Sequence, residues 1–407
     1  MRRDVDRCME ERGLDALLVC GPPHSSWETA YLVGPLKVTE AYVYKRRGEN
    51  PVLIVKAMER GEAAKGACLV LTFHQLGLTP IRRSALSKAE REAAILARIL
   101  EHFGAGGRVA LHGTGPIDVF ADAVRLLRES CGELEIVCEA PGILEVARSS
   151  KDADEIASIE NVGRRLQDVF RHTVNYLGTL IRKQGLVCDI EGEPILVGDV
   201  KELVVREAAR RRLEVPVDVI LSQGALSSVP HNRGENDEVL IVGVPIVFDL
   251  IGRDREGGYH FEITRTFCLG EIPDRVEEIH RQVARAREIA LEELRPGRSA
   301  ADANAVVSEL FEEAGYPTLR REPTTERGFV HYLGHGIGLA PIEEPYVGPL
   351  EEPMELTPGM VVTVEPGLYL PDEGIGVRIG DIAVIEKTGA ACPLDSIPKE
   401  PLIPLSG

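Results

Sequence analysis

Hydrophobic and polar positions repeat with two different periods along the chain, and these periods predict its helices and strands. In the first 150 residues, short apolar runs predict strands at 16–20, 51–55 and 108–111. Apolar residues at helical spacing predict helices at 4–13 and 87–103. Strands and helices alternate, as in an α/β domain of modest size. No glycine-rich phosphate-binding loop follows any of these strands.

The pattern changes near residue 150. Residues 149–152 are typical of a helix cap, and the long helix that follows is predicted to continue to about Leu177. The remaining segments combine helices with strands that carry polar residues, which is typical of an α+β fold with helices packed on one face of the strands. The predicted strands are 217–221, 245–250, 259–268, 360–365, 376–379 and 382–385, and the predicted helices are 199–212, 273–294 and 299–314.

Composition and charge narrow the classes of protein to consider. The chain has 407 residues, of which 44% are hydrophobic and 28% charged, and this is typical of a globular protein with two domains. Residues 1–150 contain 20 basic and 20 acidic residues, whereas residues 151–407 contain 27 and 45, so the second part carries the whole net charge of −18. This acidic surplus argues against nucleic-acid binding. The lack of an apolar leader or a membrane-length apolar run predicts a cytoplasmic protein without a membrane partner.

Four ionisable residues stand where an apolar strand pattern favours hydrophobic side chains. Asp249 and Glu365 each end an apolar run, Glu262 follows Asp249 by 13 residues, and His335 lies between two glycines. A buried carboxylate is costly unless it is paired or bound to a cation, and clustered carboxylates raise one another's pKa unless a divalent ion neutralises them. The alternative is that each acid ends its strand at the surface or pairs with an arginine.

Five motifs in order resemble the creatinase/prolidase/methionine aminopeptidase family, whose catalytic domain has the pita-bread fold. They are the segments 229–232, 247–249, 258–266, 334–336 and 363–367. The resemblance covers essentially the whole chain and points in particular to bacterial and archaeal Xaa-Pro dipeptidases and aminopeptidases. It implies an α+β architecture, with a creatinase-type α/β domain at residues 1–147 and a pita-bread catalytic domain at residues 148–407.

The resemblance also implies roles for individual residues. In the family, five residues hold two divalent metals, and nearby histidines orient the substrate and stabilise the tetrahedral intermediate. By position, the implied metal ligands are Asp249, Glu262, His335 and Glu365. His231 matches the substrate-side histidine of the family. His331 and Arg378 match positions that contact the substrate or support the site.

Three positions depart from the family pattern. Glu262 replaces an aspartate ligand, Gly380 replaces the fifth, bridging glutamate, and Ile342 replaces a second catalytic histidine. Asp381 cannot replace that glutamate, because neighbouring strand residues point to opposite faces. A missing oxyanion donor typically costs about a hundredfold or more in rate. We therefore expect one divalent ion (Mn, Fe, Co or Zn) rather than two, with a metal-free site left open, and His260 is a candidate replacement ligand.

Three functions remain open at this point. The first is an Xaa-Pro-type peptidase that hydrolyses amide bonds in small peptides with an altered or mononuclear metal site. The second is a metal-independent, creatinase-like hydrolase of a small cationic guanidino or ureido substrate, with His231 as general acid and base. The third is an inactive pseudo-peptidase that binds peptides or proteins. The resemblance implies a homodimer, and His280 is predicted to face solvent.

Overall fold

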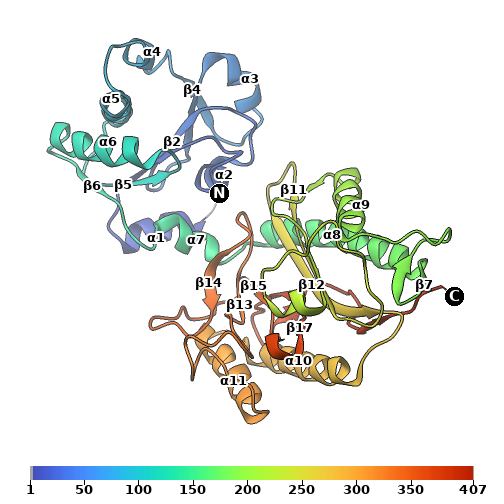
Figure 1. Ribbon diagram of the computed structural model, residues 1–407. Coiled ribbons are helices and arrows are strands. Elements are labelled where there is room, and N and C mark those ends of the chain that lie inside the picture. The colour runs from blue at the N-terminus through green and yellow to red at the C-terminus, as the bar shows by residue number, and fades with distance from the viewer. Residues whose placement is uncertain (1–2, 407) are drawn as a thin grey trace. The chain divides into compact units, whose positions relative to one another are not determined.

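The computed structural model describes residues 3–406, which form two compact units. The first unit extends to Arg148 and includes residues 256–258. The second unit comprises Ser149–Arg255 and the residues from Tyr259 onward. Both units combine helices with sheets (Figure 1).

The first unit contains a six-stranded mixed sheet in the order β4-β3-β2-β1-β5-β6. The central strand β1 lies antiparallel to β2 and parallel to β5. The strands are β1 (Ala16–Cys20), β2 (Ala41–Arg46), β3 (Val52–Val55), β4 (Leu69–Thr72), β5 (Arg108–Gly113) and β6 (Glu135–Val137). The helices are α1 (Arg3–Glu11), α2 (Trp27–Val33), α3 (Arg60–Ala63), α4 (Leu78–Arg82), α5 (Lys88–His102), α6 (Ile117–Ser130) and α7 (Ile143–Ser149), which ends at the unit boundary.

Helix α5 shows how the sequence pattern builds this unit. Ser87 and Glu90 form a capping box that satisfies backbone N–H groups at the start of the helix. The apolar residues Ile95, Leu96 and Ile99 are buried at helical spacing against the sheet. The helix also packs against α6 (Figure 1). The predicted α/β pattern is therefore present, although the sequence analysis did not identify α6 or the strands β2, β4 and β6.

The second unit contains two five-stranded sheets. One has the order β10-β11-β12-β20 with β9 paired to β11, and the other has the order β14-β13-β15-β18-β19. Two-stranded ribbons form from β16 and β17 and from β7 and β8. The strands are β7 (Ile181–Lys183), β8 (Leu186–Cys188), β9 (Leu213–Glu214), β10 (Ile220–Gln223), β11 (Ile246–Asp254), β12 (His260–Leu269), β13 (Gly334–Gly336), β14 (Glu343–Val347), β15 (Val361–Val364), β16 (Gly367–Leu370), β17 (Ile375–Arg378), β18 (Asp381–Val384), β19 (Cys392–Pro393) and β20 (Leu402–Ile403).

Two pairs of helices cover these strands. Helices α8 (Ala153–Gly178) and α9 (Val197–Arg210) share an apolar core with β11 and β12. Helices α10 (Asp274–Glu293) and α11 (Ala300–Glu313) share a second core with β14, β15, β16 and β17. In Figure 1 the two pairs lie on either side of the strands. The predicted α+β fold class is confirmed.

The environment of one histidine differs from the sequence prediction. His280 was predicted to face solvent, and this prediction is wrong, because its exposed fraction is 5%. It lies on α10 one turn after Val276 and about one turn before Val283, on the apolar face of the helix.

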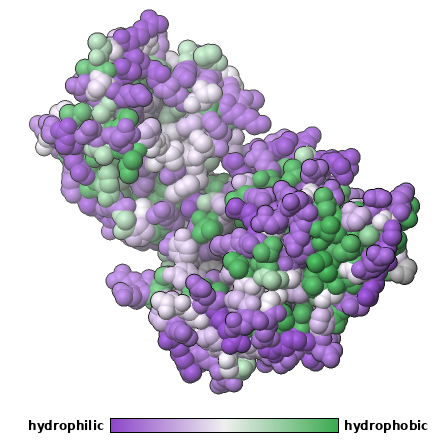
Figure 2. Space-filling model, viewed as in Figure 1, coloured by the Kyte–Doolittle hydropathy of each residue, from purple (hydrophilic) through white to green (hydrophobic). Residues whose placement is uncertain are grey.

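In the view of Figure 2, hydrophilic residues dominate the visible surface of each unit, and hydrophobic residues are interspersed among these hydrophilic residues. None of the described helices has the length and apolar composition needed to cross a membrane.

Candidate metal centre

The hairpin of β11 and β12 brings two of the predicted acids to one face. Asp249 lies opposite Thr264, and Ile251 lies opposite Glu262. Side chains two residues apart on a strand point to the same side, so the carboxyl groups of Asp249 and Glu262 are diagonal neighbours on one face of the hairpin. Both side chains are buried.

His335 and Glu365 come from the other sheet. The backbone N–H of His335 on β13 donates to Thr363 Oγ1 at 3.0 Å, and that of Glu365, directly after β15, donates to Leu333 O at 2.7 Å. The glycine that precedes His335 allows this close approach, since a Cβ on Gly334 would lie 2.0 Å from the carbonyl oxygen of Thr363. The glycine motif around His335 therefore serves to seat the histidine close to β15.

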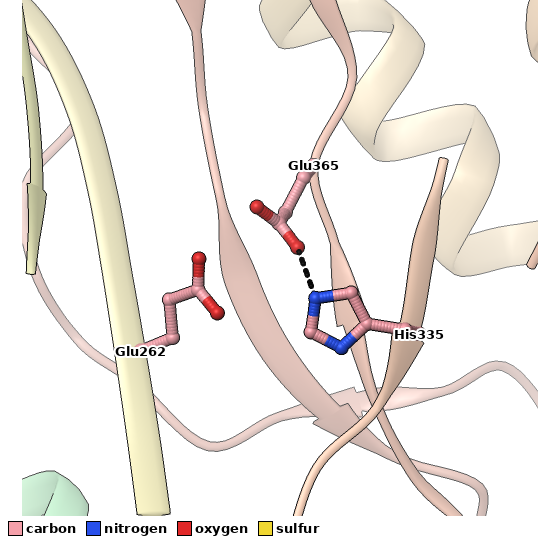
Figure 3. A group of neighbouring side chains, drawn as sticks. All are labelled: Glu262, His335 and Glu365. Atoms are coloured by element: carbon pink, nitrogen blue, oxygen red, sulfur yellow. Dashed lines mark ion pairs between the residues drawn. The ribbon is translucent and has the colours of Figure 1, made fainter. Parts of the chain in front are cut away.

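Three side chains converge at the centre of the second unit. Glu262, His335 and Glu365 each offer a ligand atom within 4.8 Å of the others. Figure 3 shows the three side chains pointing toward one another, Glu262 from β12, His335 from β13 and Glu365 from the segment directly after β15. His335 Nδ1 lies 3.0 Å from the carbonyl oxygen of Gly336, which places the proton on Nδ1 and leaves the Nε2 lone pair available. Nε2 lies 3.6 Å from Glu365 Oε1.

The electrostatics of this group favour a cation. Burial raises the pKa of Glu262 well above its usual value, and the charges of Glu365 and Asp249 raise it further. Burial also acts to raise the pKa of Glu365, but His335 and Arg378 outweigh it, so the net direction is downward. Glu262 Oε2 is buried without a hydrogen-bond donor among the described residues. An imidazole nitrogen and two carboxylates fit a divalent transition metal.

Asp249 has a different partner from the other acids. Its Oδ2 accepts a hydrogen bond from Arg378 Nη2 in a buried ion pair. Arg378 Nη1 also donates to the carbonyl oxygen of Pro230 at 3.3 Å and to the hydroxyl of Tyr369 at 3.4 Å. The structure thus places Asp249 beside the three converging side chains but pairs it with an arginine.

A buried tyrosine links two of the predicted site residues, and the sequence analysis did not identify it. The Tyr369 hydroxyl lies 3.1 Å from His331 Nε2 and accepts from Arg378. Burial lowers the pKa of His331 to about 4 and raises that of Tyr369 to about 12, so both side chains are neutral near pH 7. The sequence feature that could have identified Tyr369 is its hydroxyl group, which is the only polar side-chain group in the strand β16.

A cavity of about 270 Å³ opens onto this group. It brings together most of the predicted site residues, namely His231, Asp249, Glu262, His335, Glu365 and Arg378, whereas His331 is not part of its lining. Ile342 also lines the cavity and is 52% exposed. The candidate replacement ligand His260 is directed elsewhere, since its Nδ1 lies 3.1 Å from the carbonyl oxygen of Gly338 and it is not one of the three converging residues.

The position of the missing fifth ligand is closed by neighbouring side chains. Gly380 pairs with Thr264, and a Cβ on Gly380 would lie 2.9 Å from Thr264 Cβ and 3.2 Å from Glu365 Cγ. The next residue, Asp381, pairs with Arg265 at 2.8 Å and with Arg287 instead of joining the cavity. Neither residue supplies a ligand.

Comparisons with known proteins agree with this geometry. A probable dipeptidase, PepE, of Mycobacterium tuberculosis is 31% identical over 277 residues, which are 67% of this chain and 66% of the relative, slightly less than two thirds of its length. An uncharacterized peptidase of Bacillus subtilis, YqhT, is 31% identical over 67% of this chain and 69% of its own. An Xaa-Pro dipeptidase of Pyrococcus furiosus is 35% identical over 173 residues, 42% of this chain and 46% of its own.

Solved structures show the same fold over almost the whole chain. The X-Pro aminopeptidase of Thermotoga maritima superposes with a TM-score of 0.75 at 22% identity, covering 97% of this chain and 99% of its own. The Xaa-Pro dipeptidase of Bacillus anthracis gives a TM-score of 0.76 at 22% identity and covers 98% of both chains. The sequence profile of metallopeptidase family M24 matches residues 158–387, more than half of the chain. This chain belongs to metallopeptidase family M24, a family of metal-dependent hydrolases with the pita-bread fold.

Proposed function

We propose that this chain is an Xaa-Pro-type peptidase that hydrolyses amide bonds in small peptides with a single divalent ion. The observation that supports the proposal most directly is the convergence of Glu262, His335 and Glu365 within 4.8 Å of one another beside a cavity. Three protein ligands with an open position are the usual arrangement of a catalytic metal site. The dipeptidase relatives support the reaction class.

The charges of the site favour one ion over two. Glu262 and Glu365 together neutralise one divalent ion, while the charge of Asp249 is already balanced by Arg378. A second ion would lack a bridging carboxylate, because Gly380 offers no side chain. Mixed imidazole and carboxylate ligands suit manganese, iron, cobalt or zinc.

The side chains of the site have different roles in the reaction. A bound divalent ion supplies Lewis acidity and a water molecule of lowered pKa. Arg378 holds Asp249 and the Tyr369 hydroxyl in fixed positions. We assign to His231, which is exposed at the cavity, the donation of a proton to the departing amine. His331, neutral near pH 7, holds the Tyr369 hydroxyl from its other side.

The test is hydrolysis of Ala-Pro by the full chain after dialysis against chelator, with and without added Mn²⁺ or Zn²⁺. The proposal predicts turnover only with metal, and loss of that turnover in Glu365→Gln. A matched control is Glu355→Gln, which changes an exposed acid outside the cavity lining. Metal-independent turnover of a guanidino compound that disappears in His231→Ala would instead establish the creatinase-like reaction and overturn this proposal.

We further propose, from the family resemblance, that residues 148–407 form the catalytic domain, that residues 1–147 form the creatinase-type domain, and that the chain is a homodimer. Sedimentation equilibrium of the full chain tests the dimer. It predicts a particle of twice the chain mass of 44.5 kDa. A single-chain mass at micromolar concentration would contradict it.

A further inference from the structure

One buried ion pair of the second unit takes no part in the candidate metal centre. Lys151 Nζ lies 2.7 Å from Glu343 Oε1, and the two side chains are 2% and 0% exposed. Neither residue lines the cavity. Taking two charges out of water costs free energy, and an apolar pair of similar size is often no less stable. Stability alone therefore gives no reason for charges at these positions, and the contacts of the pair point to a second role.

Glu343 holds the loop of residues 337–342, which connects β13 to β14. Its second carboxylate oxygen, Oε2, accepts a hydrogen bond from the backbone N–H of Ala340 at 3.2 Å. The pair also packs against the backbone of the loop, since a Cβ on Gly338 would lie 2.7 Å from Glu343 Oε1 and 3.2 Å from Lys151 Cε. Lys151 Nζ in turn donates to the carbonyl oxygen two residues before it at 3.1 Å. The pair thus ties the middle of the loop to the first residues of the second unit.

The loop carries one residue of the cavity. Its last residue, Ile342, lines the cavity and is 52% exposed, whereas the side chain of Glu343 is buried against Lys151. Consecutive residues of an extended segment point to opposite sides. The contact between Lys151 and Glu343 therefore determines the side on which Ile342 lies.

The proposed metal ligands are positioned by other contacts. His335 and Glu365 are held by hydrogen bonds that join the segments of β13 and β15, and Glu262 is held by the pairing of β12 with β11. Lys151 takes part in none of these contacts. Loss of the ion pair is therefore expected to move Ile342 and to leave the metal ligands in place.

We propose that Lys151 is a positioning residue for the substrate. Through Glu343 it holds the loop of residues 337–342, and the loop places Ile342 against the bound peptide. The inference rests on the proposed peptidase function and adds a residue that affects peptide binding without touching the peptide or the metal ion. Loss of Lys151 weakens peptide binding and leaves metal binding intact.

The first experiment compares the kinetics of Ala-Pro hydrolysis by the Mn²⁺-loaded wild type and by Lys151→Met. KM is expected to rise about tenfold, the size of one lost aliphatic contact, while kcat and the Mn²⁺ content per chain stay unchanged. Adding Glu343→Gln should restore KM, because the neutral amide needs no cation and its oxygen can still accept from Ala340. Lys45→Met is the matched control and should leave KM unchanged, since Lys45 is a buried lysine paired with Asp6 in the first unit.

A double-mutant cycle shows whether Lys151 acts through Ile342. Ile342→Ala alone should raise KM by a similar factor, and adding it to Lys151→Met should raise KM little further, because the contact is already lost. Effects on KM that multiply would overturn the proposal, as would a loss of metal content in Lys151→Met. If Lys151→Met does not fold, Lys151→Arg replaces it, because the larger head group against Gly338 displaces the loop; an unchanged KM in that variant would also overturn the proposal.

Hydrogen exchange tests the loop without any substrate. The peptide that covers residues 337–343 should exchange its amides about tenfold faster in Lys151→Met, because the acceptor of the Ala340 N–H is displaced, and should not change in Lys45→Met. Unchanged exchange in Lys151→Met overturns the role of Lys151, whether or not the chain is a peptidase. Faster exchange in a chain whose wild type does not cleave Ala-Pro supports the hold of Lys151 on the loop and shows that the peptidase function is wrong.

Discussion

Two clusters of largely buried charged residues adjoin the start of β18, and only one of them contains at least as many cations as carboxylates. The arginine cluster contains two carboxylates and three cations, namely Asp381, Asp395, Arg265, Arg287 and Lys399. The candidate metal centre contains three carboxylates, one arginine and a histidine, namely Asp249, Glu262, Glu365, Arg378 and His335. The two clusters meet at two consecutive residues of the chain. Gly380 adjoins the metal centre, and Asp381 belongs to the arginine cluster.

The difference between the clusters shows which one depends on an external ion. In the arginine cluster, burial acts to raise the pKa of Asp381, but Arg265 and the other cations outweigh it, so the carboxyl stays ionised. In the metal centre, burial and two neighbouring acids leave the pKa of Glu262 well above its usual value. The cations of the arginine cluster therefore keep Asp381 ionised without an external ion, whereas the metal centre lacks positive charge.

The largest expected effect comes from unbalancing the arginine cluster. Arg265 pairs with both aspartates and donates to the carbonyl oxygens of Thr264 and Gly380 at 2.8 and 2.7 Å. Arg265→Met should lower the free energy of unfolding by about 3–5 kcal/mol, because it removes the arginine that pairs with the buried Asp395 carboxylate and one of the three cations that pair with Asp381. Urea unfolding of chelator-treated protein measures this. Arg275→Met, which removes a surface ion pair with Glu373, should cost far less, and equal losses would contradict the comparison.

A smaller effect is expected in the pH dependence of the free energy of unfolding, through His280. Burial lowers the pKa of His280 to about 4, and Arg265 adds to the shift. Because the unfolded chain has a pKa near 6.5 at this residue, it binds more protons than the folded chain between these values. The stabilising contribution is present above about pH 6.5 and is lost as pH falls toward 4, by about 3 kcal/mol. Denaturant unfolding at pH 7 and 4.5 should show a smaller acid loss in His280→Gln; an identical loss would refute this assignment.

The change in stability on adding a metal ion should distinguish the two clusters directly. Mn²⁺ at a hundred times its dissociation constant should stabilise the wild type by about 2.7 kcal/mol. Glu262→Gln should show no such gain and should be no less stable than the wild type without metal, since it removes a poorly compensated buried acid. Thermal unfolding with and without Mn²⁺ measures both quantities. Arg265→Met should keep the Mn²⁺ gain if it still folds, and a metal gain in Glu262→Gln would mean that the ligand set is wrong.

The smallest expected effect is on kcat and concerns Ile342, which lines the cavity. Ile342 is exposed at the cavity where the family pattern has a histidine. Ile342→His should raise kcat for Ala-Pro by about tenfold, because it restores a hydrogen-bond donor near the developing oxyanion. Ile342→Ala serves as the control and should not raise kcat. A fall in kcat for the histidine variant, with metal binding intact, would show that an apolar side chain is needed at this position instead.

The sequence predicted those parts of the molecule that depend on local pattern. Capping residues and helical spacing located α5 and α8, and the alternation of strand residues correctly excluded Asp381 from the cavity. The short strands β4 and β6 were not predicted, because isolated runs of three or four residues show little periodicity. His280 was misplaced because a polar residue on an apolar helix face looks like a surface residue unless its neighbours are counted.

The candidate site was predictable in its members but not in its pairings. The acids and histidines were identified as a group, yet the pairing of Asp249 with Arg378 depends on the distance between β11 and β17, which no local pattern specifies. Tyr369 was missed for the same reason. Its role comes from its contacts with His331 and Arg378, which tertiary structure alone determines.

The most direct test of the account is the number of metal ions bound per chain. Chelator-treated protein is equilibrated with excess Mn²⁺ or Zn²⁺, freed of unbound metal and analysed by mass spectrometry of the metal content. The account predicts one ion per chain in the wild type and none in Glu365→Gln. Two ions per chain, or one ion retained in Glu365→Gln, would contradict a mononuclear centre formed by Glu262, His335 and Glu365.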